Sequence, residues 1–238
     1  MARRGKKSVF STVVSLIVVA AIAWMKYKET NEQNVREGSV RDDSVVVSQP
    51  NDEAITDSLS SVSLSSSKFE VFEDCKLVDH RGNDGDSFHV MTSKGDQEFR
   101  LYYVDAPESA ARKYRDGNTN YKRIAEQGAA MGGIDQKETT QVGVEAKLFV
   151  KDLLKGKRFR VATVWESVYN SGRNYAYILV SYEGKECYLH ELLVARGLGR
   201  IHTKGYLLPD NTSVSRQKKK LYQLEKNAKQ QGYGAWGL

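Results

Sequence analysis

Residues 69–104 read FEVFEDCKLVDHRGNDGDSFHVMTSKGDQEFRLYYV, and the architecture can be worked out from this stretch. Three of its segments mix apolar and polar residues as short β-strands do: Phe69–Val78, Phe88–Thr92 and Glu98–Val104. The segments between them, Asn83–Asp86 and Ser93–Asp96, carry the Asn, Asp and Gly residues that tight turns favour. Two consecutive antiparallel hairpins, and therefore a three-stranded meander, are predicted.

A helix is predicted in the middle of the chain. Val142, Ala146, Phe149 and Leu153 recur at spacings of four, three and four residues, which places them on one helical face, and Gly156 is a stop signal. The segment before it, residues 109–142, gives a weaker pattern. It predicts an added helix over Tyr121–Met131 that either narrows the neighbouring cleft or packs on the sheet.

The last third of the chain predicts two more strands and two more helices. The strands are Arg158–Glu166 and Asn174–Tyr182, joined by a turn at Asn170–Gly172, and the helices are Leu189–Arg196 and Ser213–Gln230. Three strands, a helix, two strands and two helices follow the order of a five-stranded Greek-key OB-fold barrel. We therefore expect an α+β domain over residues 69–238, with three or more helices packed on the barrel.

The amino-terminal part has a different character. Residues 1–7 are basic, and residues 8–25 form an uncharged, largely apolar run of 18 residues that would reach about 27 Å as a helix, close to the thickness of a bilayer. We expect a transmembrane signal anchor with the rest of the chain outside the cytoplasm. The alternative is a signal peptide cleaved at Ala21–Ala23, followed by secretion. Residues 26–68 are polar and rich in serine, so a disordered tether is predicted.

Composition gives weaker information. The chain has 36 Lys and Arg against 30 Asp and Glu, a net charge of +6, which fits a polyanionic partner without requiring one. Two cysteines, Cys75 and Cys187, are too few for a disulfide scaffold, and their pairing stays open. The basic run Arg216–Lys220 is interpreted as a solvated helix face, with a nucleic-acid contact as the alternative.

Four short segments carry residues suited to phosphate chemistry: Asp84-Gly85-Asp86, Arg100, Asp105-Ala106-Pro107-Glu108 and Gly172-Arg173. Each alone fits a turn, a surface residue or a helix start. Together, two carboxylates brought close repel unless a cation lies between them, and oxygen-only ligands favour calcium or magnesium. An arginine inside an apolar strand needs an anionic partner, and its planar fork matches a phosphate.

The segments DGDSFHV, FRLYYVDAPES and GRNYAYILV, in this order, resemble the thermonuclease (staphylococcal nuclease) family over most of residues 69–238. The resemblance implies a calcium-dependent nuclease that hydrolyses DNA, RNA or both, as a monomeric catalytic domain. It implies that calcium is held by Asp86, Asp105, the backbone carbonyl of Ala106 and, through water, Asp84. Arg100 and Arg173 would clamp the phosphate, and Glu108 would orient the attacking water.

The sequence also departs from the pattern of that family. Residues 109–142 are longer than in compact members, and Asn170-Ser171 replace a Lys-Tyr pair before Gly172-Arg173. Tyr169, His202 or Tyr206 could take over the lost nucleotide contact, or be ordinary surface and core residues. A catalytically silent OB-fold module that binds nucleic acid or a protein is the competing hypothesis, which retention of all five charged site residues disfavours.

Overall fold

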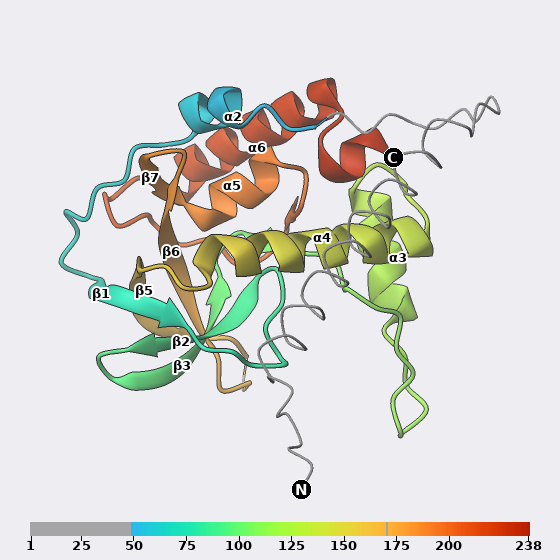
Figure 1. Ribbon diagram of the computed structural model, residues 1–238, viewed down its shortest axis with the longest axis horizontal. Helices are drawn as coiled ribbons and strands as arrows, with labels where there is room; N and C mark the ends of the chain where they lie inside the picture. The colour runs from blue at the N-terminus through green and yellow to red at the C-terminus, as the bar shows by residue number, and fades with distance from the viewer. Residues whose placement is uncertain (1–48, 170) are drawn as a thin grey trace, which may run out of the picture. The chain divides into compact units, whose positions relative to one another are not determined.

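The computed structural model describes residues 49–169 and 171–238, and Figure 1 shows how their helices and strands are arranged. The predicted basic segment 1–7 and membrane segment 8–25 lie outside the described residues. Among the residues that are described, no helix is both long enough and apolar enough to cross a membrane.

Five strands form a closed barrel, as predicted. They are β1 (Glu70–Leu77), β2 (Ser87–Thr92), β3 (Gly95–Leu101), β5 (Phe159–Ser167) and β6 (Asn174–Tyr182). Antiparallel pairings link β3, β2, β1, β5 and β6 in that order, and β3 pairs with β6 in parallel to close the ring. The predicted OB-fold α+β architecture is confirmed.

The predicted third strand is wrong at its end. Glu98–Val104 is not continuous, because β3 ends at Leu101 and Tyr103 has a left-handed φ of 68°. The chain turns there and forms a separate short strand, β4 (Val104–Asp105), which pairs with β8 (Arg200–Ile201). The break places Asp105 opposite Arg200 of β8, while its carboxylate still contacts Arg100 of β3. A further strand, β7 (Lys185–Tyr188), extends the sheet beside β6 and was not predicted.

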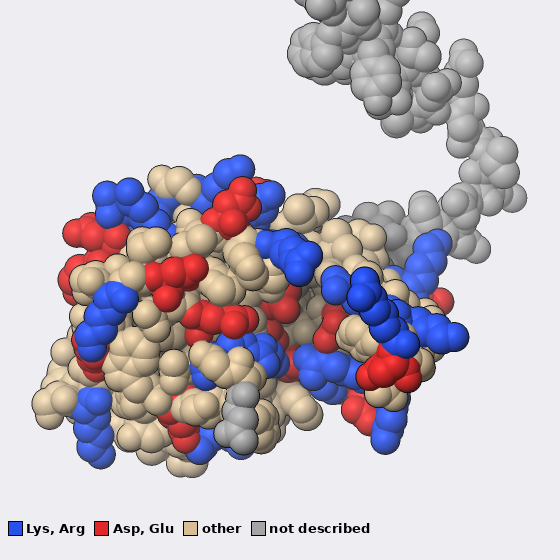
Figure 2. All heavy atoms as spheres, turned by 90° about the horizontal axis from the view of Figure 1, so that it is seen from below, with Lys and Arg blue, Asp and Glu red and all other residues tan. Residues whose placement is uncertain are grey.

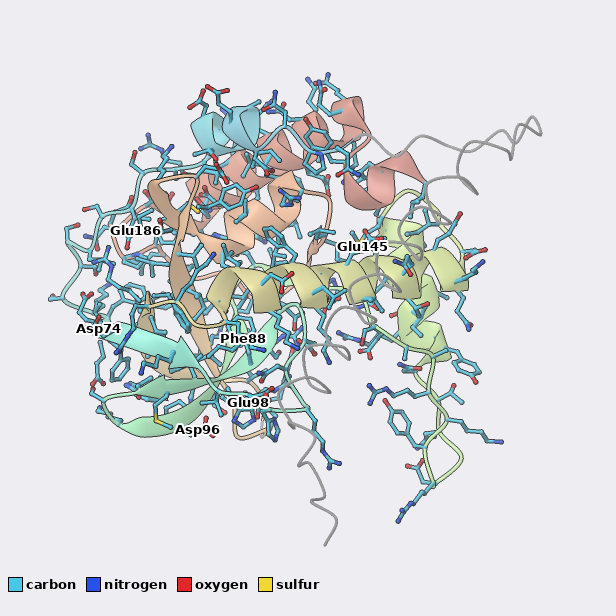
Figure 3. The ribbon with its side chains drawn as sticks, in the orientation of Figure 1. Asp74, Phe88, Asp96, Glu98, Glu145 and Glu186 are labelled. Atoms are coloured by element: carbon cyan, nitrogen blue, oxygen red, sulfur yellow. The ribbon has the colours of Figure 1, made fainter. Side chains whose placement is uncertain are left out.

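Helices cover the barrel on two sides (Figure 1). They are α3 (Tyr121–Ala130), α4 (Gln136–Leu154), α5 (Leu189–Ala195), α6 (Val214–Gln231) and a closing 3₁₀ turn (Gly234–Gly237). The predicted helix of the middle segment is α4, which begins earlier than its apolar face because Asp135 and Glu138 form a capping box there. Phe88 of β2 lies beneath α4 (Figure 3). Phe88 and the buried residues of α4 belong to the same apolar core.

The predicted tether is wrong for its carboxy-terminal part. Helix α2 (Asp52–Ser58) is capped by Asn51, whose side chain accepts a hydrogen bond from the Ala54 amide. Ile55 and Leu59 are each only 4% exposed, because they pack into the domain core. The domain therefore begins well before Phe69. Cys75 and Cys187 are both buried and free, so no disulfide joins them.

Candidate active site

The two acidic segments meet because small residues let them approach. A side chain at Gly85 would place its Cβ 2.7 Å from Cβ of Ala106 and 2.9 Å from Cβ of Ala146 on α4. The glycine between Asp84 and Asp86 is thus required by packing and not only by the turn. The Leu101 amide donates to the carbonyl of Asp86 at 2.9 Å, which fixes this loop to the end of β3.

Arg100 lies between the two predicted metal-binding carboxylates. Its Nη2 donates to Asp86 Oδ2 at 3.1 Å and to Asp105 Oδ1 at 2.7 Å, and its Nη1 donates to Asp86 Oδ1 at 3.2 Å. Arg100 is 9% exposed, Asp86 2% and Asp105 0%. A buried arginine in an apolar strand therefore has the anionic partners that the sequence required, and the structure brings all three residues together.

The carboxylate of Asp105 has more positively charged partners than the sequence predicted. Besides Arg100, its carboxylate accepts hydrogen bonds from Arg123 at 2.7 Å, from Arg200 at 2.9 Å and from the Gln127 amide at 2.9 Å. Arg123 and Gln127 lie on α3, whereas Arg200 lies on β8, opposite Asp105 in the ladder. None of these three donors was named from the sequence. The only signal in the sequence for Arg123 and Gln127 was that both lie on the predicted helix Tyr121–Met131.

Glu108 is held at the edge of the same cluster. Its Oε1 accepts from Nε of Arg123 at 2.8 Å, and its Oε2 accepts from the Asn120 side chain at 3.2 Å. The amide of Glu108 donates to Gln127 Oε1 at 3.0 Å. The added helix α3 therefore supplies residues to the site and packs on α4, whereas packing on the barrel was the alternative predicted for residues 109–142.

The pKa values of the two aspartates differ because their carboxylates contact different numbers of arginines. Burial and the nearby Asp84 carboxylate raise the pKa of Asp86 to about 8, against the opposing effect of Arg100. Burial alone would also raise the pKa of Asp105, but Arg123, Gln127 and Arg200 outweigh it and hold that pKa below its usual range. Asp86, which faces Asp84 and a single arginine, is therefore the less acidic of the two carboxylates.

Arg173 approaches the cluster from the loop before β6. Its Nη1 lies 3.2 Å from Oγ of Ser87, and Nη1 of Arg100 lies 3.2 Å from the same oxygen. Two guanidinium groups, one from β3 and one from the loop before β6, therefore converge on one hydroxyl. This convergence follows from the parallel pairing of β3 with β6, in which Arg100 lies opposite Tyr175.

A cavity of about 320 Å³ opens beside these groups, and its charged lining is mostly positive: Arg100, Arg123, Arg173, Lys204 and Asp105. Tyr169 and His202 also line it, and Tyr169 is 87% exposed at its border. Tyr206 instead packs in the aromatic core against Tyr102. Of the three residues predicted to compensate for the missing tyrosine, two are thus placed at the cavity.

Asp84 and Ala106 have other partners in the structure. Oδ1 of Asp84 accepts from the amides of Asp86 at 3.1 Å and Ser87 at 2.8 Å, so its side chain shapes the loop. The Ala106 carbonyl accepts from Gln127 Nε2 at 3.0 Å. Both remain next to the two aspartates, and their predicted roles toward a metal remain predictions.

The basic run on α6 is mainly a solvated face. Arg216, Lys218 and Lys219 are exposed, while the buried face of the helix carries Gln217 and Leu221. This placement agrees with the first interpretation of Arg216–Lys220 and leaves the nucleic-acid contact a prediction.

Comparison with known proteins gives one match. A family model described as staphylococcal nuclease homologue matches residues 98–237, which includes the end of β3, every helix from α3 onward and the site residues from Arg100 to Arg173, but not Asp84 or Asp86. No curated protein matches the chain.

Proposed function

Because this chain belongs to the staphylococcal nuclease family, we propose that it hydrolyses phosphodiester bonds of DNA, RNA or both, with calcium as its metal ion. The observation that carries the proposal is the convergence of Arg100 and Arg173 on Ser87 Oγ, 3.2 Å from each, beside a cavity that contains a carboxylate. Two planar guanidinium groups aimed at one point fit the oxygens of a single phosphate group.

Among the described residues no group of three or more His, Cys, Asp or Glu side chains is placed to hold a metal ion, so the calcium proposal rests on two carboxylates and one carbonyl. Asp86 Oδ2 and Asp105 Oδ1 both lie within 3.1 Å of the same Arg100 nitrogen, so one cationic group already bridges them. All the atoms predicted to bind the metal are oxygens, the type that calcium prefers. Burial and the neighbouring Asp84 carboxylate raise the pKa of Asp86 to about 8, and a divalent ion beside this carboxylate would favour its charged form.

We propose the following catalytic roles for these residues. Arg100 and Arg173 bind the non-bridging oxygens of the phosphodiester and stabilise the charge that grows on them in the transition state. Glu108, oriented by Arg123 and Asn120, accepts a proton from the attacking water as the water oxygen bonds to phosphorus. The bond from phosphorus to the 5′ oxygen breaks in the same displacement, and the leaving 5′ oxygen takes a proton from solvent. Bound calcium, held by Asp86, Asp105 and the Ala106 carbonyl, would add Lewis-acid stabilisation of the phosphate oxygens.

We also propose that the catalytic domain lies outside the cytoplasm, on the strength of the basic residues 1–7 and the apolar segment 8–25. A weak calcium site of about 10⁻⁴–10⁻³ M affinity would be filled in such a compartment. N-terminal sequencing of the mature protein tests the manner of attachment. A mature chain that begins after Ala23 contradicts the anchor and supports secretion.

The experiment that tests the nuclease is cleavage of fluorescent single-stranded DNA, RNA and duplex DNA by the purified chain, with calcium or with a chelator. Cleavage is expected only with calcium. Arg173→Ala is expected to lower kcat/KM by about 10²–10³-fold, the usual effect of removing one preorganised charge donor. Arg173 contacts only hydroxyl groups of Ser87 and Ser171, so its loss leaves the aspartate pair intact.

Arg158→Ala is the matched control, since Arg158 is exposed and donates only to the Asp74 carbonyl.

Arg100→Ala is also expected to remove activity. It is also expected to destabilise the fold, because it would bury Asp86 and Asp105 without their shared cation. Strand binding without calcium-dependent cleavage would overturn the nuclease and support the silent OB-fold module.

A further inference from the structure

The segment between β4 and α3 carries a projecting arm, residues 111–119. Every residue of the arm is exposed, whereas Asn120 at its base is buried. Figure 1 shows it extending away from the body of the domain below α3, and Figure 3 shows its side chains directed outward. An arm of this kind contributes nothing to the core, so its side chains are free to contact another molecule.

The arm is held in a defined shape by its own backbone. Lys113 and Thr119 form an antiparallel bridge, and the amide of Tyr114 donates to the Asn118 carbonyl at 2.8 Å. Gly117 has a φ of 84°, which the turn at the tip needs. At the base, the Arg112 amide donates to the Asn120 side chain at 2.7 Å.

The chemistry of the arm is basic with one aromatic ring. Arg112, Lys113 and Arg115 stand against Asp116, whose carboxylate bonds with Asn118. Within the part of the chain that the structure describes, none of these three cations forms a salt bridge. Tyr114, between them, is 48% exposed. Unpaired cations with an exposed aromatic ring fit a strand of nucleic acid, whose phosphates they neutralise and whose bases stack on the ring.

The arm begins at the candidate active site. Asn120, which closes it, donates to Oε2 of Glu108 at 3.2 Å and to the Ala110 carbonyl at 2.9 Å. Arg123, one helical turn further on, lines the cavity. Figure 2 views the molecule from the side toward which the arm extends, and Lys and Arg side chains gather there at the right, where Figure 1 places the arm and α3. A strand that leaves the cavity past Glu108 would therefore meet further positive charge.

We propose that the arm is a binding site for single-stranded nucleic acid, with Arg112, Lys113 and Arg115 on the phosphates and Tyr114 stacked on an unpaired base. This inference rests on the proposed function of the neighbouring cavity and extends its substrate class to strands of several nucleotides. Stacking on Tyr114 needs a base that is not paired, so the arm favours single strands over duplexes.

The test measures binding without cleavage. The full chain is titrated into a fluorescent 20-nucleotide oligothymidine in a chelator, and anisotropy gives Kd at several salt concentrations. The triple variant Arg112→Ala, Lys113→Ala, Arg115→Ala is expected to bind at least about tenfold more weakly. Its slope of log affinity against log salt should fall by about 2, since each phosphate contact to a single strand contributes about 0.7. Tyr114→Ala is expected to lose about fivefold or more without a change of slope.

The matched control is Lys218→Ala, Lys219→Ala, Lys220→Ala, which removes the same charge from α6 and is expected to weaken binding less than threefold. Equal losses for the two triple variants, or no loss for the arm variant, would overturn the proposal. So would a loss that is as large for a duplex of the same length. None of these binding measurements requires hydrolysis. A protein that binds through residues 111–119 but cleaves nothing would therefore overturn the proposed nuclease activity and leave this proposal standing.

Discussion

At the scale of single residues, Arg123 is the group that most changes the picture of the site. It touches both Asp105 Oδ1, at 2.7 Å, and Glu108 Oε1, at 2.8 Å, while its own side chain stays 41% exposed. Burial lowers its pKa, but the two carboxylates outweigh burial and raise it, so it is charged at any ordinary pH. Arg123 thus neutralises a carboxylate proposed to hold calcium and orients the one proposed to hold water.

The first prediction concerns the substitution Arg123→Ala. Removing a cation from the neighbourhood of Asp105 leaves the oxygen ligands more negative, so calcium should bind more tightly, by about tenfold. Glu108 loses one of its two orienting partners, so kcat at saturating calcium should fall by about tenfold. Calorimetric calcium titration measures the first effect, and turnover at saturating calcium measures the second.

Lys122→Ala is the control, because that side chain is 89% exposed and its nearest acid, Glu126, is 3.9 Å away. An unchanged or weakened calcium affinity in Arg123→Ala would show that Arg123 does not compete with the metal for Asp105.

At the scale of elements, helix α4 sets the position of the Asp105–Glu108 segment. Gly143 on α4 faces this segment so closely that an added Cβ would lie 2.5 Å from the carbonyl oxygens of both Pro107 and Glu108. Ala146, one turn further, faces Gly85. The small residues of α4 therefore let the helix support both acidic segments at once, and the catalytic geometry depends on that close approach.

The second prediction is that Gly143→Ala reduces kcat by about tenfold or more. Backbone carbonyls cannot yield as a flexible side chain can, so the added methyl group must move Glu108 away from its partners. Leu148→Ala, at a position on the same helix that is 52% exposed, should leave the rate unchanged. Steady-state kinetics on both variants decide between a supporting role for α4 and none.

The elements differed in how well their patterns could be recognised. Helix α4 and the strands β5 and β6 repeat apolar residues over many positions, so their periods were clear. Strand β7, only four residues long, gives no period, and helix α2 was hidden in a serine-rich segment because its two buried anchors are isolated. Tyr103 broke the predicted third strand because its left-handed backbone is stabilised by tertiary contacts, including the bond of its amide to the Lys204 carbonyl.

At the scale of the whole molecule, the described residues before Phe69, from α2 onward, are part of the folded domain. Lys185 Nζ donates to the carbonyls of Thr56 and Leu59, each at 3.0 Å, and the Ser60 amide donates to Glu191 Oε2 at 2.8 Å. Glu191 also accepts from Gln217 on α6 at 2.8 Å, so one buried carboxylate joins the amino-terminal segment to the last helix. The folded domain therefore includes the residues around Thr56 to Ser60 and does not begin at Phe69.

The third prediction follows from that packing. Leu59→Ala should lower the free energy of unfolding by about 2–4 kcal/mol, the usual cost of emptying a buried leucine site. Urea unfolding of the purified chain measures it, and Leu148→Ala, at an exposed position, should cost less than about 0.5 kcal/mol. Equal stability of Leu59→Ala and the unsubstituted chain would mean that the segment is not docked in solution.

The local order of residues was sufficient to predict the barrel and four of its helices, because alternation, helical period and turn residues are properties of neighbouring positions. The grouping of Asp86, Arg100, Asp105, Glu108 and Arg173 was expected from their residue types and from the family resemblance. The three further donors around Asp105 depend on folding. Arg123, Gln127 and Arg200 meet it only because β4 leaves the barrel wall to pair with β8 and because α3 packs on α4. Such contacts join residues up to 95 positions apart, and no local pattern encodes which distant side chains will share a carboxylate.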